Sequence, residues 1–343
     1  MKRLFILLFL TSFIGVCKIP ENKSIPKKRI LRPCCAFGLD LKLFGIPFIR
    51  VNKIISSNHI GEHKYLGGKN ESNGLIYTKK AGFLDLGHIR DQADWTAYLF
   101  KLIKNNKGLS EVELPLGFEL GKKVLSINIP DSTSDAHLVE LASQLAFELS
   151  TWHEIASWYG ATRTPVLNEK FSSFSFEDNF SNALGAEFGK QACLSPLNFN
   201  LAMDSLIENY LIKVEACTEV KETEWAITTL ADAYWNPKKS LSNKKIILVR
   251  NFEVSFPQYP IVFEGESDEF VDLKVTESHL NDNKVEIKYF VGYRFPFKKL
   301  FPNREERVIY SSDFSLIIED IKTRVDKIKW QSKPKEKRKR KTA

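Results

Sequence analysis

Seven ionisable residues of the kinds used in catalysis and metal binding stand at the ends of apolar segments: His63, His88, Asp91, His153, Glu154, Glu177 and Asp178. Imidazole nitrogens and carboxylate oxygens bind divalent metals, and the same groups act as general acids and bases. We therefore assign His63, His88 and His153 as candidate metal ligands, and Glu154, Asp91 and Asp178 as candidate catalytic carboxylates. Whether they meet in space depends on the elements that carry them.

Two short motifs resemble zinc-peptidase sites, but each lacks a required feature. Residues 59–63, His-Ile-Gly-Glu-His, have the HxxEH spacing. That mechanism needs both histidines on one helix face, whereas Gly61 and the nearby Gly67-Gly68 pair predict a loop. Residues 153–157 differ from HExxH because Ser157 stands where the second histidine would be. The chain also lacks GxSxG, GxxxxGK[ST] and GxGxxG, so serine hydrolase and nucleotide-binding functions lose their usual sequence evidence.

The polar cluster that contains His88 follows short apolar segments flanked by glycine. Residues 74–78 and 82–86 predict two strands or one bent strand. Beyond His88, apolar residues recur at helical spacing as far as Ile103, and Gly108 is suited to the end of a helix. The cluster is therefore expected at a strand-to-helix junction. Residues 112–129 alternate in short bursts and predict a strand pair.

The longest predicted helix covers about residues 136–159 and follows several possible N-cap residues at 131–135. At about 100° per residue, one face carries a stripe of apolar and aromatic side chains. These are Leu138, Leu141, Leu145, Leu149, Trp152, Ala156 and Tyr159. Phe147 and Trp158 lie on the opposite side, so we expect the rest of the fold to enclose this helix. Its charged residues Glu148, His153 and Glu154 then need partners, because an unpaired buried charge is costly.

These residues allow two interpretations. In the first, His153 and Glu154 belong to a metal or acid/base site together with His63, His88 and Asp91. In the second, Glu148 and Glu154 pair with Arg90, Arg163 or a lysine, and His153 bonds a carbonyl oxygen, so that the same residues stabilise the fold. Glu148 and His153 project to different sides of the helix, which excludes a single row of ligands along it.

The rest of the chain adds helices and then strands. Ser175, with Glu177 and Asp178 after it, resembles a helix start in which Ser175 is the cap, although Asp178 could equally be a functional acid. Further helices are predicted at 199–216 and 223–234, strands at 246–250, 259–264, 271–276 and 285–293, with a hairpin turn at 281–283, and a final amphipathic helix at 308–330.

The composition, with 43% hydrophobic and 12% aromatic residues, allows one large core or two modest ones. We predict an α+β fold with a helical centre around the long buried helix 136–159, short strands, and a strand-rich C-terminal part. The predicted parts are a main domain at 34–236, a strand-rich subdomain at 245–300 and a C-terminal helix at 306–332.

The N-terminus predicts export. Met1-Lys2-Arg3 and the apolar stretch after it are typical of a signal peptide at 1–16, too short to span a bilayer. Cys17 follows Ile14-Gly15-Val16, where a bacterial lipoprotein signal places its acylated cysteine, so we expect lipidation of Cys17. Cleavage nearby by ordinary signal peptidase, or an unprocessed anchor, is the alternative. Residues 17–33 are expected to be a tether, and the location to be the periplasm or the outer membrane.

The formal net charge of +8 is unevenly distributed, because residues 333–341 contain seven basic residues and one acidic residue. The tail at 333–343 is expected to be disordered and either solvated or bound to anionic lipid headgroups. No specific nucleic-acid partner is expected. Four further cysteines could form two disulfides in three pairings, with a bond between adjacent Cys34 and Cys35 the least favoured, or remain buried thiols. They are Cys34, Cys35, Cys193 and Cys217.

Six segments stand out when taken together: RPCCAFG at 32–38, GEHKY at 61–65, GLIYT at 74–78, GFLDLGHIRD at 82–91, WHEIASWYG at 152–160 and SFEDNFSNALG at 175–185. Their combination resembles a bacterial domain family of unknown function that is often found in exported proteins and lipoproteins. Position 176 is Phe where the family pattern has Pro. The resemblance supports the choice of these segments and implies no particular chemistry.

We therefore predict an exported, lipid-anchored envelope protein with a buried His/carboxylate site. The alternative is a hydrolase of an envelope substrate, in which Glu154 or Asp91 acts as general base and a divalent metal is the only cofactor considered.

Overall fold

The computed structural model describes residues 25–26, 32, 36–39, 41, 53–161, 169–239, 243–252 and 285–332. The predicted signal peptide, Cys17, Cys34, Cys35, the predicted strands at 259–264 and 271–276, the turn at 281–283 and the basic tail lie outside these residues. None of the described helices is long and apolar enough to cross a membrane. Cys193 and Cys217 are both buried.

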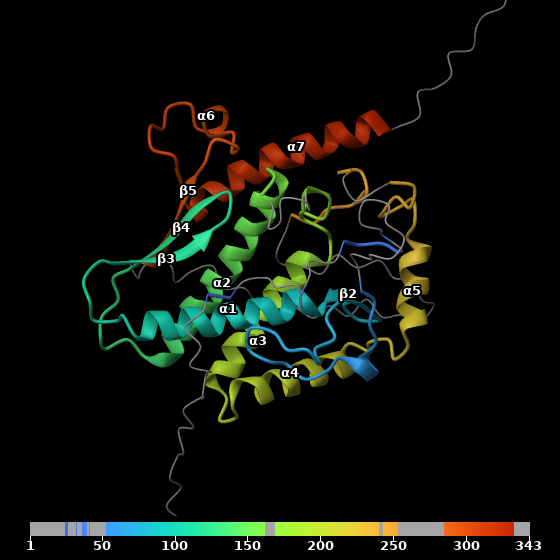
Figure 1. Ribbon diagram of the computed structural model, residues 1–343, viewed down its shortest axis with the longest axis horizontal. Coiled ribbons are helices and arrows are strands. Elements are labelled where there is room, and N and C mark those ends of the chain that lie inside the picture. The colour runs from blue at the N-terminus through green and yellow to red at the C-terminus, as the bar shows by residue number, and fades with distance from the viewer. Residues whose placement is uncertain are drawn as a thin grey trace, which may run out of the picture.

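Three helices form the centre of the molecule: α1 (Leu86–Lys104), α2 (Asp135–Trp158) and α3 (Asp178–Leu194). α1 packs against both α2 and α3. Figure 1 shows α1 in the middle, with the larger sheet at the left, α7 along the top and α5 at the right edge. Residues 152–158 of α2 are all buried, so the expectation of an enclosed helix is confirmed. The other long helices are α4 (Phe199–Lys213), α5 (Val220–Thr229) and α7 (Phe314–Ser332).

A hairpin leads directly into α1. β1 (Leu75–Thr78) and β2 (Gly82–Asp85) pair antiparallel, and Asp85 is both the last residue of β2 and the N-cap of α1. The predicted strand-to-helix junction is therefore present. The HxxEH segment at 59–63 follows a single 3-10 turn, η2 (Ser57–His59), and Gly61 has φ +66°. It lies in a loop, as expected.

The larger sheet has the order β3-β4-β5-β6, with all neighbours antiparallel. β3 (Val112–Phe118) and β4 (Gly121–Ile127) confirm the predicted strand pair, and β5 (Val285–Val291) and β6 (Val308–Ile309) come from the C-terminal part. Because β5 pairs with β4 along seven residues, this part of the predicted subdomain 245–300 completes a sheet that the main domain begins.

Two element predictions need correction. No strand forms at 246–250 in the structure, where Ile247 and Arg250 make only isolated bridges. The last helix begins at Phe314 rather than at 308, after β6 and the 3-10 turn η4 (Ser311–Asp313). A short helix α6 (Phe297–Leu300) and a 3-10 turn η3 (Glu169–Phe171) complete the described elements. Mixed helices and two small sheets confirm the α+β class.

Close contact between α1 and α3 fixes the centre of the fold. A Cβ atom on Gly185 would lie 2.3 Å from the Ile89 carbonyl oxygen, and one on Gly189 would lie 2.8 Å from the Ala93 Cα. Only glycine permits so close an approach of two helix backbones. These two glycines, one turn apart on α3, therefore set the separation at which the polar residues of the two helices meet.

Phe176, which stands where the family pattern has Pro, belongs to a second small core. Its ring lies 4.6 Å from the ring of Phe37 and 5.2 Å from that of Tyr234, between centroids. It is 1% exposed. The aromatic side chain therefore adds buried contacts at the start of α3 that a proline ring could not make.

Glu148 is a buried acid on α2 that faces the sheet. Its Oε1 accepts a hydrogen bond of 2.8 Å from the Tyr289 hydroxyl on β5. Burial raises the pKa of Glu148 to about 8, Glu286 adds to the rise, and the bonds from Tyr289 and Ser311 oppose it. Its partner is thus a tyrosine, and not Arg90 or a lysine. At neutral pH the folded state keeps a proton on Glu148 that the unfolded state releases.

This proton predicts a pH-dependent stability. Between about pH 4.5 and 8 only the folded state holds it, so the free energy of unfolding should fall across this window and level off above it. Glu148→Gln, whose amide oxygen still accepts from Tyr289, should remove this part of the slope, a difference on the order of 4 kcal/mol. Urea unfolding at pH 5 and 8.5 measures it. Glu113→Gln, an exposed change, is the control, and equal slopes in wild type and Glu148→Gln would contradict the assignment.

Candidate functional site

The first half of α1 is buried although half of its residues are polar. Every residue from Leu86 to Asp94 is buried. Asp85 caps the helix, since its Oδ1 accepts from the backbone N–H of Gly87 at 2.7 Å and of His88 at 3.3 Å. A capping carboxylate stabilises a helix N-terminus by satisfying otherwise unpaired donors. This cap fixes the position of His88 in the first turn.

His88, Glu154 and Asp178 converge from three different helices. One ligand atom from each lies within 4.8 Å of the others. The three residues are at most 2% exposed. His88 Nδ1 lies 3.3 Å from Asp178 Oδ1 and 3.4 Å from Asp85 Oδ2. We call these three residues the His88 centre. They are three of the six site residues predicted from the sequence.

The start of α3 differs from the expected cap. The N-cap residue is Glu177 in the αR conformation, without a side-chain capping bond. Ser175 therefore does not cap the helix; its hydroxyl instead donates to Glu177 Oε2 at 2.6 Å. Asp178 places its carboxylate beside His88. Of the two roles considered for Asp178, the structure favours membership of a polar site.

Negative charge is in excess around the His88 centre. Asp85, Glu154, Glu177 and Asp178 are all buried. Burial raises the pKa of Glu177 to about 8, and Asp85 adds to the rise, while Ser175 and His88 oppose it. Asp85 Oδ2 and Glu177 Oε1 are buried and have no hydrogen-bond partner among the described residues. Such atoms are unusual in folded proteins and indicate a missing cation or proton.

Arg250 is a buried cation that interacts electrostatically with three of these carboxylates. Burial lowers the pKa of Arg250 to about 10, against the opposing effect of Glu154, Asp178 and Glu177. Its guanidinium donates to the carbonyl oxygens of Ser173 and, at 3.1 Å, of Phe171. Glu154 Oε2 accepts from the backbone N–H of Phe174 at 2.6 Å. Glu154 and Arg250 thus hold the turn at 171–174 from opposite sides.

The donors of the His88 centre suit a divalent metal ion. One imidazole and two carboxylates form a mixed N/O set that binds Zn²⁺, Mn²⁺ or Fe²⁺. Three protein ligands are also the number found in catalytic zinc sites, where water takes the remaining position. A divalent cation would offset the excess negative charge.

His63 and Asp91 belong to a different cluster, organised by Arg32. The Arg32 guanidinium lies 2.5 Å from Glu71 Oε1, 2.7 Å from Asp94 Oδ2 and 3.2 Å from Asp91 Oδ1. His63 Nε2 lies 3.2 Å from Asp94 Oδ1. The pKa of Glu71 is lowered to about 2, because the hydrogen bond and charge of Arg32 outweigh burial. This cluster is a closed ion-pair network that attaches residue 32 to α1.

Removing Arg32 should destabilise the fold strongly. Arg32→Met leaves three buried carboxylates without their cation, which typically costs about 3–5 kcal/mol. Urea unfolding at pH 7 measures the loss. It should shrink as the pH falls from about 4.5 to about 2, because the pKa of Glu71 beside Arg32 is lowered to about 2 and this part of the stabilisation is lost over that range. Lys104→Met, which breaks the exposed pair with Asp135, should change stability by less than about 1 kcal/mol; a comparable loss in both variants would contradict the network's role.

His153 lies in a third environment, beside a cavity. Its Nδ1 is 2.5 Å from Glu119 Oε1 and its Nε2 is 3.8 Å from Glu169 Oε2. Glu119 Oε2 also lies 2.9 Å from Lys123 Nζ. A carboxylate, that of Glu119, is therefore a partner of His153, where a carbonyl oxygen was expected. His153, Glu119 and Glu169 line a cavity of about 900 Å³, whose described wall includes neither His88, Glu154 nor Asp178.

Comparison with known protein families agrees with the resemblance that the sequence motifs indicated. The family model described as "Protein of unknown function (DUF4056)" matches residues 22–264. The chain belongs to this family. No curated protein and no solved structure matches it. The residues that match the DUF4056 family include all three clusters. The family is described as one of unknown function, so the function has to be argued from the site geometry.

Several residues with clear roles in the structure are not among the site residues predicted from the sequence. Asp85 had a visible signal, since it precedes a helical pattern as an N-cap residue does. Arg32 begins the RPCCAFG segment, but nothing in the sequence indicated its partners, and Glu119 and Arg250 had no signal at all. The three residues lie 34 residues or more along the chain from groups that they contact: the side chains of Glu71 and His153 and the carbonyl oxygen of Ser173. Their partners depend on tertiary packing alone.

Proposed function

We propose that this protein binds a divalent metal ion at the His88 centre. The observation that carries the proposal is the convergence of an imidazole and two carboxylates, one from each central helix, within 4.8 Å and away from solvent. His88, Glu154 and Asp178 would be the protein ligands, and Asp85, whose Oδ2 lies 3.4 Å from His88 Nδ1, adds a third carboxylate beside them. Asp85 Oδ2, which is buried and has no hydrogen-bond partner among the described residues, adds support, because a cation nearby would compensate it.

The test is metal binding by the purified protein after chelation. Isothermal titration with Zn²⁺ and with Mn²⁺ should show one saturable site, and the bound ion should raise the melting temperature. Asp178→Asn, His88→Ala and Glu154→Gln should each weaken binding by at least about 100-fold. Glu154→Gln is the gentlest change, because its amide oxygen can still accept from the Phe174 N–H.

His59→Ala is the matched control, since His59 is exposed and lies outside the centre. It should bind metal like the wild type. Lack of a saturable site in the folded wild type, or equal binding by all variants, would overturn the proposal. In that case the second interpretation stands, in which the residues form a hydrogen-bonded network that stabilises the fold.

Hydrolysis of an envelope substrate is the second candidate function. It rests on the number of candidate ligands at the His88 centre, because three protein ligands would leave a bound metal ion a position for water. The cavity beside His153 is lined by the same helix, α2, but not by these three residues. The metal-loaded protein of the titration also tests this. Release of soluble fragments from purified cell-wall material, lost in His88→Ala, would support a hydrolase, whereas metal binding without release would make the ion structural.

The location proposed for this function is the outside of the cytoplasmic membrane. Support comes from the signal-like residues 1–16 and from Cys17 at the position of a lipidated cysteine. The eight residues from Cys17 to Ile25 can span at most about 30 Å, and Ile25 and Pro26 already contact the cavity wall of the body. An acyl group on Cys17 would thus hold the body close to the membrane surface.

Fractionation of cells tests the anchor. The wild-type protein should sediment with membranes and be released only by detergent, because stable anchoring needs more than one acyl chain. Cys17→Ala should appear in the soluble fraction. A variant without residues 333–343 is the control for the basic tail and should stay with the membrane if the lipid suffices. Membrane association of Cys17→Ala that survives high salt would refute the lipid anchor.

A further inference from the structure

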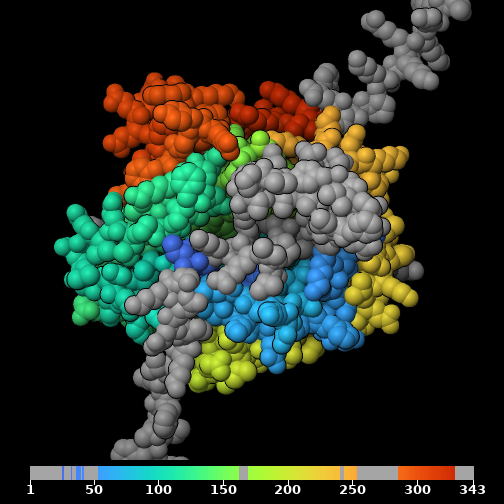
Figure 2. All heavy atoms as spheres, in the orientation of Figure 1, coloured from blue at the N-terminus to red at the C-terminus, as the bar shows by residue number. Residues whose placement is uncertain are grey.

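The cavity beside His153 lies where the sheet meets the central helices. Its described wall comes from residues 25–26, from α1, from the β3–β4 hairpin, from α2, from Gly160, Ala161 and Glu169, and from the loop after β5. Figure 2 shows the teal hairpin and the orange C-terminal segment side by side on one face, with dark-blue N-terminal residues against them. Its volume of about 900 Å³ is within the usual range of ligand sites, about 300–1,000 Å³.

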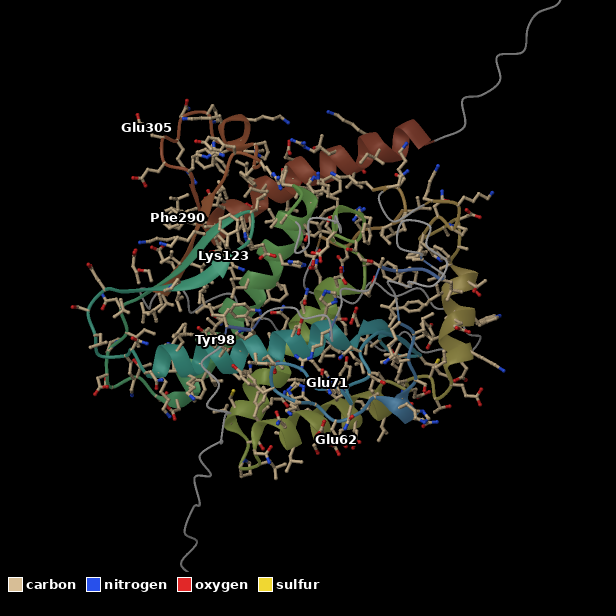
Figure 3. All side chains as sticks on the ribbon, in the orientation of Figure 1. Glu62, Glu71, Tyr98, Lys123, Phe290 and Glu305 are labelled. Atoms are coloured by element: carbon tan, nitrogen blue, oxygen red, sulfur yellow. The ribbon has the colours of Figure 1, made fainter. Side chains whose placement is uncertain are left out.

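The polar groups in this wall are charge-balanced and held in place. Lys123 pairs with Glu119, and Glu119 bonds His153, which faces Glu169 on its other side. Lys123 and His153 are each 7% exposed. Figure 3 shows Lys123 on the sheet, on the side toward the helices. Arg294 and Asp91 also belong to the wall, and Asp91 pairs with Arg32, so positive and negative groups roughly cancel. A wall of this kind offers donors and acceptors to hydroxyl and amide groups, and no surplus charge for a phosphate.

Aromatic rings stand at the edge of the same cavity. Phe118 is 80% exposed and Tyr293 is 99% exposed, and both belong to the wall. Trp95, on α1, is half-buried there, with Lys123 Nζ 5.8 Å from its ring centroid. Large exposed rings beside fixed polar groups are a common feature of binding sites. They provide flat apolar faces for a ligand that is itself polar at its edges.

The ligand that fits both features is an uncharged sugar chain. Each sugar ring has an apolar face that can stack on an aromatic ring, and hydroxyl or acetamido groups at its rim that hydrogen-bond. An extended peptide fits less well, although β3 is the edge strand of the sheet. Pro115 has no N–H to offer, and the register of β3 shifts between Pro115 and Phe118. The edge cannot supply the regular ladder that a peptide strand needs.

The geometry points to this cavity as a binding site for an uncharged oligosaccharide, with Phe118, Trp95 and Tyr293 as stacking platforms and with Glu119, Lys123 and His153 as hydrogen-bonding groups. This site is separate from the His88 centre and does not depend on a metal there. Its ligand class is that of neutral glycans in the cell envelope.

Isothermal titration of the full-length protein with defined tetramers tests the inference. The probes are the β-1,4-linked tetramers of N-acetylglucosamine and of glucose, with tetra-alanine as the peptide. Saturable binding of at least one sugar is expected. Tyr293→Ala and Phe118→Ala should each weaken it by about 5- to 10-fold, since each removes one ring contact. Both side chains are highly exposed, so the fold should be unaffected, which circular dichroism checks.

Trp225→Ala is the matched control, because Trp225 is a half-exposed aromatic residue on α5 and outside the cavity wall. It should bind the sugar as the wild type does. Removal of metal by chelation should leave the affinity unchanged, which separates this site from the His88 centre. The inference is overturned if neither sugar binds saturably, if only tetra-alanine binds, or if Tyr293→Ala and Phe118→Ala both retain full affinity.

Discussion

Burial of the charged first half of α1 is the constraint on which the rest of the structure depends. Asp85, His88, Arg90, Asp91 and Asp94 are all buried in or beside three turns of helix. A buried charge without partners costs several kcal/mol, so each must be met by a group from elsewhere in the chain. Arg90 is met by the carbonyl oxygens of Ile60, Gly61 and Ser72 and by the Asn73 side chain. Arg32 meets Asp91 and Asp94, and Asp178 meets His88. Three distant segments are thus brought to one helix by charge and not only by apolar contact.

The packing of α3 on α1 brings a partner to the buried polar residues of α1 and so forms the His88 centre. Gly185 and Gly189 let the two backbones touch, and the start of α3 therefore reaches the first turn of α1, where Asp178 lies beside His88. Two consecutive residues of α2 face two different environments. Glu154 points to the His88 centre and the turn at 171–174, whereas His153 points to Glu119 and the cavity. Neighbours on a helix differ by about 100° in direction, so one helix can serve an enclosed polar centre and an open pocket at the same time.

The sequence predicted the elements better than the contacts. Periodicity located the central helices and the β3–β4 pair, because the apolar stripe that buries a helix is recorded within the helix itself. Residue type and position at the ends of apolar segments had singled out His88, Glu154 and Asp178, which the structure brings together. Periodicity does not indicate whether His63, His88 and His153 belong to one site. The structure places the three histidines in three clusters. The angle count already gave Glu154 and His153 different directions. The positions of residues on a helix do not identify the partners of its buried charged groups, since Arg32, Glu119 and Arg250 are distant in sequence.

This distribution also explains why no standard catalytic motif is found. Motifs such as HExxH record ligands that share one helix, so that spacing along the chain reflects spacing in the site. Here each of the three central helices contributes one residue to the His88 centre, at positions 88, 154 and 178. These residues come together through helix packing, the glycines of α3 and the cap at Asp85. None of these features requires the residues to be close together in the sequence. The near miss at residues 153–157 has the same origin, because Glu154 serves the centre while the residue beside it, His153, faces away. The residues of a site assembled in this way stand in separate short segments of the sequence, and only the fold shows that they belong together.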